Sequence, residues 1–230
     1  MKNIAIIPAR GGSKRIPRKN IKEFCGKPII AYSIEAALTS DLFDEVMVST
    51  DDEEIAEVAI KYGAKVPFFR SSDNSNDYAT LVDVLLEVLN QYEITGELFD
   101  NICCILPTAP FISEQRIEES FNLMEDKKYA SIFPVLEYSY PIQRSLIKST
   151  DGLIKMACPE NLSVRSQDLE KHYHDSGQFY WIRKRSLLEE KTVFTSNTGV
   201  IELSQLEVQD IDTLDDWKIA EIKYQIINAS

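Results

Sequence analysis

Residues 4–20 read IAIIPARGGSKRIPRKN, and this stretch decides the fold that we expect for the whole chain. The apolar run of residues 4–7 ends at Pro8 and is too short for a stable helix, so it predicts a buried parallel strand. The loop that follows contains five basic residues and no acid. We expect Gly11 and Gly12 to adopt positive φ angles, which would turn their N–H groups towards one concavity. A loop of this kind is typical of a polyphosphate-binding site.

The basic loop stands out because the rest of the chain is acidic. Residues 1–27 carry eight Lys or Arg and one Glu, whereas the whole chain has a formal net charge of −12. We therefore predict an anion site, with a merely solvated loop as the alternative. The glycine spacing fits neither a P-loop nor G-x-G-x-x-G, which disfavours a nicotinamide-dependent dehydrogenase.

Length and composition predict a single α/β domain over residues 1–230, since 44% hydrophobic and 27% charged residues are ordinary for a globular chain. No apolar run approaches the roughly 18 to 20 residues that span a bilayer, and the first run is too short for a signal peptide. We expect a cytoplasmic protein with no membrane partner. A pI of about 4.7 argues against nucleic acid as the main partner, because duplex binding needs an extended basic face. Four cysteines without metal-ligand spacing, Cys25, Cys103, Cys104 and Cys158, are expected to be buried thiols.

Helical and extended patterns alternate through the first half of the chain. We expect strands at residues 45–49, 66–69, 101–106 and 130–136, and helices at residues 28–39, 52–62, 81–92 and 114–126. Thr50 and Asp51 are candidates for capping the second helix, which Gly63 ends. The alternation predicts a Rossmann-like, doubly wound, mostly parallel sheet, whose ligands bind at the carboxyl ends of the strands.

This alternation stops between residues 134 and 171, where short extended pieces and polar turns replace it. A structureless insertion of this length is uncommon inside a compact domain. We interpret residues 134–171 as an inserted flap or as an arm that pairs with a second subunit. We favour the arm, which implies a homodimer.

Residues 209–217, QDIDTLDDW, contain a candidate metal site. If this segment is a strand, Asp210 and Asp212 face the same way and Ile211 faces the core. Two carboxylates on one face suit Mg²⁺, or Mn²⁺, with water and phosphate completing the octahedron. The alternative is a helix that starts at residue 214 and is capped by Asp212 or Thr213.

Several motifs resemble the acylneuraminate or sugar-acid cytidylyltransferase family, whose members activate sugar acids with CTP. They are PARGGSKRIPRKNI at residues 8–21, GKP at residues 26–28, PTAP at residues 107–110 and DIDT at residues 210–213. The resemblance covers essentially the whole chain. It implies a fold of the nucleotide-diphospho-sugar transferase type. It also implies an enzyme that transfers CMP from CTP to the anomeric hydroxyl of a nonulosonic acid and releases pyrophosphate.

The resemblance assigns roles to residues around the nucleotide. Catalysis would depend on positioning and charge, with Arg10, Lys14, Lys19 and Asp212 as the catalytic candidates and Asp210 and Asp212 holding Mg²⁺. The nucleotide-binding candidates are Ala9, Arg10, Gly11, Gly12, Ser13, Asn20, Arg70, Ala79, Pro107 and Thr108. Arg70 and Ala79 would lie beside the cytosine and Asn20 beside the ribose. Asp77 would orient its neighbours, with an ordinary helix-capping loop as the alternative.

Three segments resemble the pseudaminic acid branch of this family: YPIQR at residues 140–144, RSQDL at residues 165–169 and YHDSGQFYW at residues 173–181. Acylneuraminate enzymes usually have Gln where this chain has Leu106, which implies a less hydroxylated sugar acid. The substrate-binding candidates are Leu106, Gln143, Arg144, Arg165, His174, Asp175, Gln178 and Tyr180. Among them, Arg144 and Arg165 are the candidates for pairing with the sugar carboxylate.

Other interpretations stay open. His172 and His174 suggest a second metal site, although hydrogen bonding to a polyhydroxy sugar is the simpler role. Neuraminic or legionaminic acid is the alternative acceptor. A non-catalytic nucleotide-binding regulator is a further alternative, disfavoured by Lys19 and the aspartate pair. The general base would be a metal-bound hydroxide or a carboxylate such as Asp175.

Overall fold

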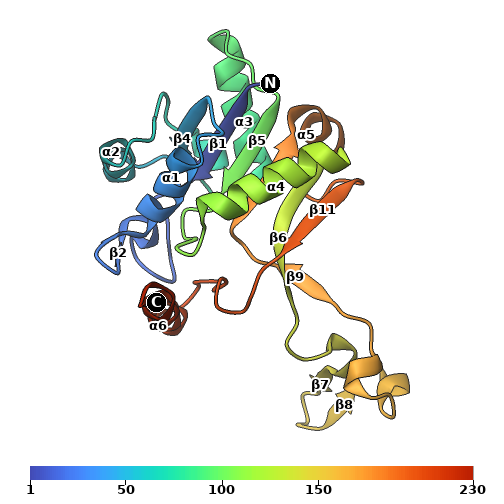
Figure 1. Ribbon diagram of the computed structural model, residues 1–230. Helices are drawn as coiled ribbons and strands as arrows, with labels where there is room; N and C mark the ends of the chain where they lie inside the picture. The colour runs from blue at the N-terminus through green and yellow to red at the C-terminus, as the bar shows by residue number, and fades with distance from the viewer. Residues whose placement is uncertain (230) are drawn as a thin grey trace.

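Seven strands form the central sheet of residues 1–229, which are the residues described by the structure, a computed structural model (Figure 1). Their order is β11-β6-β10-β5-β1-β4, and β9 pairs with β6 outside this path. The strands are β1 (Asn3–Pro8), β4 (Glu45–Ser49), β5 (Asn101–Ile105), β6 (Ser131–Glu137), β9 (Tyr173–Asp175), β10 (Phe179–Arg183) and β11 (Thr198–Glu202).

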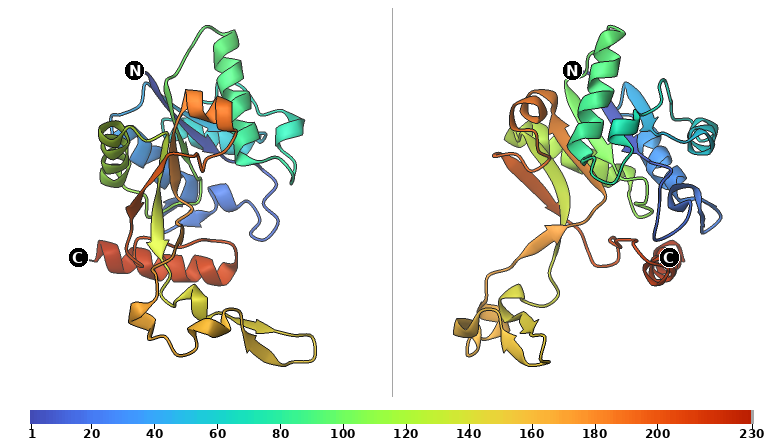
Figure 2. Two further views of the ribbon diagram at one scale, coloured as in Figure 1. Left: turned by 90° about the vertical axis from the view of Figure 1, so that its right-hand side faces the viewer. Right: turned by 180° about the vertical axis from the view of Figure 1, so that it is seen from behind.

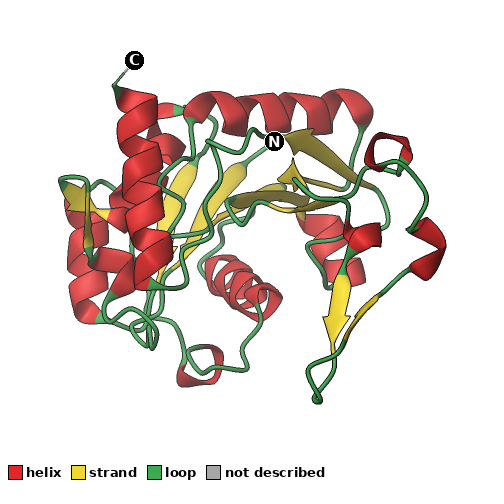
Figure 3. Cartoon of the chain, turned by 90° about the horizontal axis from the view of Figure 1, so that it is seen from below, coloured by secondary structure: helices red, strands yellow, loops and turns green. Residues whose placement is uncertain are grey.

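Helices cover both faces of this sheet because β1 and β5 are apolar on both faces (Figures 2 and 3). Ile4 and Ile6 join the core with α3 and α5, whereas Ala5 and Ile7 join the core with α1, α2 and α4. The helices are α1 (Ile29–Thr39), α2 (Glu53–Lys61), α3 (Leu81–Ile94), α4 (Glu114–Lys127), α5 (Lys184–Glu190) and α6 (Leu214–Asn228). The doubly wound α/β architecture is confirmed.

The sheet differs from the sequence prediction in the direction of one strand and in which segments form strands. Strand β10 runs antiparallel to both β5 and β6, so the sheet is mixed where a mostly parallel one was expected. Residues 66–69 do not form the predicted strand, because only Lys65 bridges Met47 on β4 before the chain bends away. Strand β11, which the sequence analysis did not anticipate, pairs in parallel with β6.

The helices have ordinary caps, but the residue that caps one of them differs from the prediction. The side chain of Asp52, and not that of Thr50 or Asp51, caps α2 by accepting a hydrogen bond from the N–H of Ile55. Gly63 follows this helix with φ +98°. Helices α3 and α6 begin with reciprocal capping boxes, which stabilise their first turns.

Residues 138–172 project from the ends of β6 and β9, away from the rest of the chain (Figures 1 and 2). The predicted insertion began at residue 134, but residues 134–137 belong to β6 and pair with β11 or β9. This arm contains the antiparallel strands β7 (Leu146–Lys148) and β8 (Ile154–Met156). It also exposes several large apolar side chains, namely those of Tyr140, Leu146, Leu153, Ile154 and Leu162.

Helix α6 packs at the edge of the molecule against the short hairpin of β2 (Glu23–Phe24) and β3 (Lys27–Pro28). Phe24 is fully buried there, and its ring packs edge-on against Trp217 and Tyr224 of α6. Ile211 is buried in the same cluster, as the sequence predicted. This packing brings Ile211 and Asp212, which precede α6, beside Lys19 and Arg15 of the basic loop.

Candidate active site

Three adjoining hollows lie at the edge of the sheet where β1 and β5 end. The basic hollow, of about 380 Å³, is lined by Pro8, Arg10, Ser13, Lys14, Arg15, Ile16, Lys19, Asn20, Pro107 and Thr108. The loop hollow is lined by Pro8, Arg10, Arg70, Asn74, Asn76, Asp77, Ala79, Thr80, Leu81, Val84 and Leu106. The β9 hollow is lined by Leu106, Leu136, His174, Asp175, Ser176, Gly177, Gln205, Val208, Gln209, Asp210 and Lys223. The basic and loop hollows share Pro8 and Arg10, and the loop and β9 hollows share Leu106, so the three are neighbours.

The glycines of the basic loop act differently from the prediction. Neither Gly11 nor Gly12 has a positive φ, and the N–H of Gly11 donates to Asp51 Oδ1 at 2.8 Å. A Cβ atom on Gly11 would lie 2.7 Å from Asp52 Oδ2, so glycine is required there by close approach and not by φ. The anion-binding groups of this loop are therefore mainly side chains.

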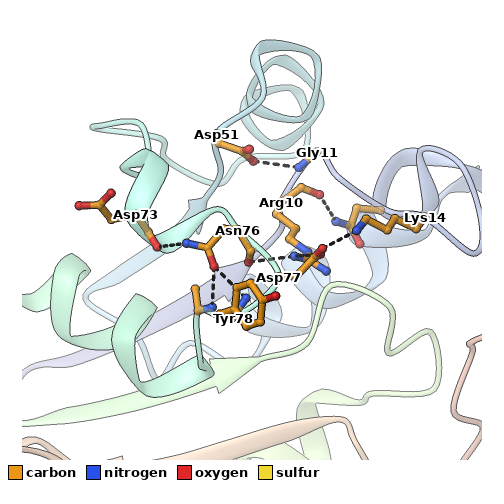
Figure 4. Close-up of polar contacts among 10 residues, drawn as sticks. Arg10, Gly11, Lys14, Asp51, Asp73, Asn76, Asp77 and Tyr78 are labelled. Carbon is orange, nitrogen blue, oxygen red and sulfur yellow. Dashed lines mark hydrogen bonds and ion pairs between the residues drawn. The ribbon is translucent and has the colours of Figure 1, made fainter.

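Two cations of the loop face one carboxylate (Figure 4). Arg10 Nη1 lies 3.0 Å from Asp77 Oδ1 and donates to the Asn76 carbonyl at 3.0 Å, and Lys14 forms an ion pair with the same aspartate. Lys14 and Arg10 hold the pKa of Asp77 below its usual value. Asp77 thus ties the 70–80 loop to the basic loop.

Arg18 points away from the basic hollow. Its guanidinium forms ion pairs with Asp52 and Glu54, and its hydrogen bonds lower the pKa of Asp52 to about 2. Arg18 itself adopts a left-handed backbone conformation with φ 55°. It fastens the loop to the start of α2, which leaves Arg10, Lys14, Arg15 and Lys19 as the cations that line the hollow.

Lys19 links the basic loop to the segment before α6. Its Nζ donates to the Ile211 carbonyl at 2.7 Å and lies 3.9 Å from Asp212 Oδ1. Burial lowers the pKa of Lys19, and Asp212 opposes that shift. Arg15 Nη2 also lies 2.7 Å from Asp212 Oδ1. Asp212 is thus held by two cations of the predicted phosphate site.

Asp210 and Asp212 lie close together, although not on the strand that the sequence predicted. Residues 207–212 have no regular secondary structure, and Thr213 caps α6, as the alternative interpretation required. Burial and the Asp212 charge raise the pKa of Asp210. Among residues 1–229, no group of three or more His, Cys, Asp or Glu is arranged to hold a metal. With two carboxylates alone, a divalent cation such as Mg²⁺ would have to take its other ligands from phosphate and water.

The loop hollow contains both predicted base-side residues. Arg70 is 8% exposed, and its Nε donates to Ser49 Oγ at 3.0 Å, so the side chain is fixed beside β4. Burial lowers the pKa of Arg70. Ala79 lines the same hollow, and its N–H donates to Asn76 Oδ1 at 3.1 Å.

The other nucleotide candidates divide into lining and supporting groups. Pro107, Thr108 and Ser13 line the basic hollow. Asn20 lines it too, but its amide donates to the Arg10 carbonyl at 2.9 Å and so braces the loop. The buried Ala9 extends the pairing of β1 by donating its N–H to the Ser49 carbonyl at 2.9 Å.

His174, Asp175 and Leu106, three of the predicted substrate-binding residues, line the β9 hollow. Asp175 accepts hydrogen bonds from the Gly177 N–H at 2.8 Å and from the Tyr180 hydroxyl. Tyr180 is buried, so its role is to hold Asp175. Gln178 is also buried and donates to the Glu207 carbonyl at 2.5 Å, which makes it a bracing residue and not a lining one.

Three predicted substrate residues lie in the arm and not in these hollows. Gln143 donates to the Glu170 carbonyl at 2.8 Å, Arg144 donates to the Val164 carbonyl, and Arg165 forms an ion pair with Asp168. Within one chain, the structure does not bring them to the site.

Sequence reasoning missed several lining residues. Arg15 was noted only as part of the basic loop, and Ser176, Gln209 and Lys223 were given no role. The Ser176 Oγ is buried without a hydrogen-bond partner in the part of the chain that the structure describes. Lys223 was not recognisable, because no local pattern shows which residues of α6 face the β9 hollow.

Two further expectations from the sequence concern the histidine pair and the four cysteines. Within residues 1–229, neither His172 nor His174 belongs to a group of three or more His, Cys, Asp or Glu that could hold a metal. Cys103 and Cys104 are buried in β5 as predicted, but Cys25 is exposed and Cys158 is partly exposed.

The chain is similar to proteins of known activity along its whole length. The family model described as cytidylyltransferase matches residues 4–224. The pseudaminic acid cytidylyltransferase of Campylobacter jejuni is 43% identical over 230 residues, which are 100% of this chain and 99% of that protein. The CMP-N,N'-diacetyllegionaminic acid synthase of Legionella pneumophila is 33% identical over 96% of this chain and 95% of its own length.

A solved structure shares the fold. A CMP:2-keto-3-deoxy-manno-octonic acid synthetase complexed with CTP aligns over 100% of both chains with a TM-score of 0.72 and 21% identity. Within residues 1–229, no helix has the length and hydrophobicity needed to cross a bilayer.

Proposed function

We propose, on the premise that this chain belongs to the cytidylyltransferase family, that it transfers CMP from CTP to pseudaminic acid and releases pyrophosphate. The chain is a nucleotidyltransferase whose acceptor is a nonulosonic acid, as in its pseudaminic and legionaminic relatives. The observation that carries the choice of acid is the 43% identity to a pseudaminic acid cytidylyltransferase over the full chain. CTP is a cytoplasmic metabolite, so we place the reaction in the cytoplasm.

The three hollows suggest how the substrates sit. The cytosine would occupy the loop hollow beside Arg70 and Ala79, and the triphosphate would occupy the basic hollow. Arg10 and Lys14 would exchange the Asp77 carboxylate for phosphate oxygens, since both already hold an anionic group at that position. The sugar acid would occupy the β9 hollow, with its anomeric hydroxyl towards the α-phosphorus.

Charge stabilisation is the main catalytic contribution that the chain's own residues supply. The anomeric hydroxyl oxygen would form a bond to the α-phosphorus, the bond to the β-phosphate would break to release pyrophosphate, and the hydroxyl proton would pass to a base such as Asp175. Negative charge increases on the phosphate oxygens during this step. Lys19 and Arg15, which line the basic hollow, would offset that charge. Asp175, held by Gly177 and Tyr180, would accept a hydrogen bond from a sugar hydroxyl and orient the acceptor.

We propose Mg²⁺, or Mn²⁺ in its place, as the metal, with Asp210 and Asp212 as its protein ligands. When bound, it would neutralise phosphate charge during the transfer. The raised pKa of Asp210 supports this assignment, because two neighbouring carboxylates in a partly buried place are stabilised by a cation between them.

The sugar preference follows from Leu106, which lies where the loop hollow meets the β9 hollow. Its side chain has no hydrogen-bonding group, so a sugar hydroxyl facing it would lose a partner. Such a loss costs about 1 to 3 kcal/mol. Pseudaminic acid, with a methyl-terminated side chain and two acylamido groups, suits this wall better than a fully hydroxylated acid.

We expect kcat/KM for N-acetylneuraminic acid to be at least about tenfold lower than for pseudaminic acid. The measurement is pyrophosphate release at saturating CTP and Mg²⁺, with pseudaminic, legionaminic and N-acetylneuraminic acids compared side by side. Equal or better use of N-acetylneuraminic acid would overturn the choice of substrate and leave the cytidylyltransferase activity intact. No pyrophosphate release with any acid would instead support the nucleotide-binding regulator.

We also propose that two copies of this chain form a homodimer through the arm, residues 138–172. The arm exposes apolar side chains and carries Gln143, Arg144 and Arg165 away from their own chain's site. In a dimer, these residues would be available to the second copy. A large exposed apolar surface on a projecting segment is typical of an interface.

The dimer predicts a sedimenting species of twice the 26.2 kDa chain mass at micromolar concentration. Replacing the exposed Leu146 and Ile154 of the arm hairpin by Asp should shift the protein towards the monomer while the sheet stays folded. The matched control is Ile60→Asp, an exposed apolar residue of α2. A wild-type monomer, or equal dissociation of the control, would contradict the arm interface.

A further inference from the structure

The β9 hollow contains one lysine or arginine among the lining residues that the structure describes, and it is Lys223 of α6. Its Nζ donates to the Gln205 carbonyl at 3.0 Å and to the Val208 carbonyl at 2.7 Å. No acid of residues 1–229 forms an ion pair with it. Two of its three N–H donors are occupied, and one is left for a ligand.

We infer that Lys223 binds the carboxylate of the acceptor sugar acid. This inference rests on the proposed function and identifies which charge of the chain recognises the acid group. A carboxylate entering this hollow meets Asp175 on the wall, and Asp210 is the proposed metal ligand, so the acid group needs a cation of the protein in the same hollow. Lys223 is that cation, and neutral backbone carbonyls hold its side chain in place.

The other cations near the site are engaged elsewhere. Arg10 and Lys14 face Asp77, and Arg15 and Lys19 face Asp212. Within one chain, Arg144 and Arg165 make their contacts inside the arm. Burial lowers the pKa of Lys223, as expected for an ammonium group whose charge no neighbouring acid offsets. A carboxylate bound beside Lys223 would offset the positive charge of its ammonium group.

The test is a cycle of two enzymes and two acceptors at saturating CTP and Mg²⁺. The acceptors are pseudaminic acid and its C1 carboxamide, which keeps the shape and removes the charge. For wild type, we expect kcat/KM to fall about 10- to 100-fold from acid to carboxamide, as for loss of one charged hydrogen bond. Lys223→Met should show a similar loss with the acid. With the carboxamide, this variant should be at most about threefold less active than wild type.

Controls separate binding from loop support. Lys218→Met removes the same charge from an exposed position of the same helix and should leave both acceptors unaffected. Lys223→Arg should retain most activity with the acid, and calorimetry should show unchanged CTP binding in every variant. If Lys223→Met lost activity equally with both acceptors, Lys223 would only support residues 205–208 and the inference would be overturned.

A failure of the proposed function would give a different experimental result. Wild-type enzyme that releases no pyrophosphate with any nonulosonic acid would refute the function itself. Wild-type activity with the full carboxamide effect retained in Lys223→Met would keep the function and refute Lys223. That result would mean that another cation, such as one in the arm of a second copy, binds the carboxylate.

Discussion

Asp212→Asn should lower kcat by about 10²- to 10³-fold, the usual loss when one preorganised group that stabilises transition-state charge is removed. Asp212 is held by Arg15 at 2.7 Å and lies 3.9 Å from Lys19, so its carboxylate lies beside the basic hollow. An amide keeps the shape and loses the negative charge that a divalent cation requires. Steady-state pyrophosphate release with CTP and pseudaminic acid measures the effect.

The control for Asp212→Asn is Asp215→Asn, three residues further on. Asp215 lies in the first turn of α6, is 88% exposed and pairs only with Lys218 among residues 1–229, so this change should leave kcat within about twofold. Thermal unfolding should show both variants folded. Binding of Mn²⁺ in the presence of CTP, followed by electron paramagnetic resonance, should weaken in Asp212→Asn alone. Near wild-type turnover in Asp212→Asn would refute the metal assignment.

Lys19→Met should lower kcat/KM for CTP by about 10²-fold or more, because a positioned ammonium group next to the triphosphate forms charge-assisted hydrogen bonds. The side chain is only 21% exposed, and its contact with the Ile211 carbonyl fixes it at the wall of the basic hollow. Methionine keeps the length and apolar stem of the side chain and removes the charge. Initial rates at varied CTP concentration measure the loss.

Lys22→Met is the matched control for Lys19→Met. Lys22 lies outside the basic hollow, with its ammonium group 5.1 Å from the centroid of the Trp217 ring. The Lys22→Met substitution removes the same charge from the same stretch of chain. We expect its kcat/KM for CTP to stay within about threefold of wild type. Calorimetric titration with CTP should show weaker binding for Lys19→Met than for Lys22→Met. Equal affinities would mean that Lys19 does not contact the nucleotide.

The course of the backbone was largely readable from local patterns. The apolar run before Pro8, the capped helices and the apolar residues 102–106 all predicted elements that the structure contains. Such patterns report which faces must be buried, and burial on both faces requires helices on both sides of a sheet. The basic loop was recognisable for a similar reason, since its charge contrasts with the chain around it.

Errors arose where distant contacts decided the outcome. Residues 66–69 are as apolar as a strand but lie at the edge beyond β4, where only one bridge forms. Gly11 was assigned to a positive φ, whereas its real constraint is the approach of Asp52 from the next unit of the fold. Strand β10 enters between β5 and β6, and no local feature of its sequence specifies that position.

The sequence by itself determined the class of fold, the basic loop, the aspartate pair and membership of a family. Only the tertiary structure decided which of these charges meet. Arg10 and Asp77 are 67 residues apart in the chain, and Lys19 and Ile211 are 192 apart, yet both pairs are in hydrogen-bond contact. Lys223 enters the β9 hollow because the aromatic packing of α6 on Phe24 places it there. Local sequence reports the preferences of the backbone and the need for burial, whereas a binding site depends on side chains that packing brings together from separate elements.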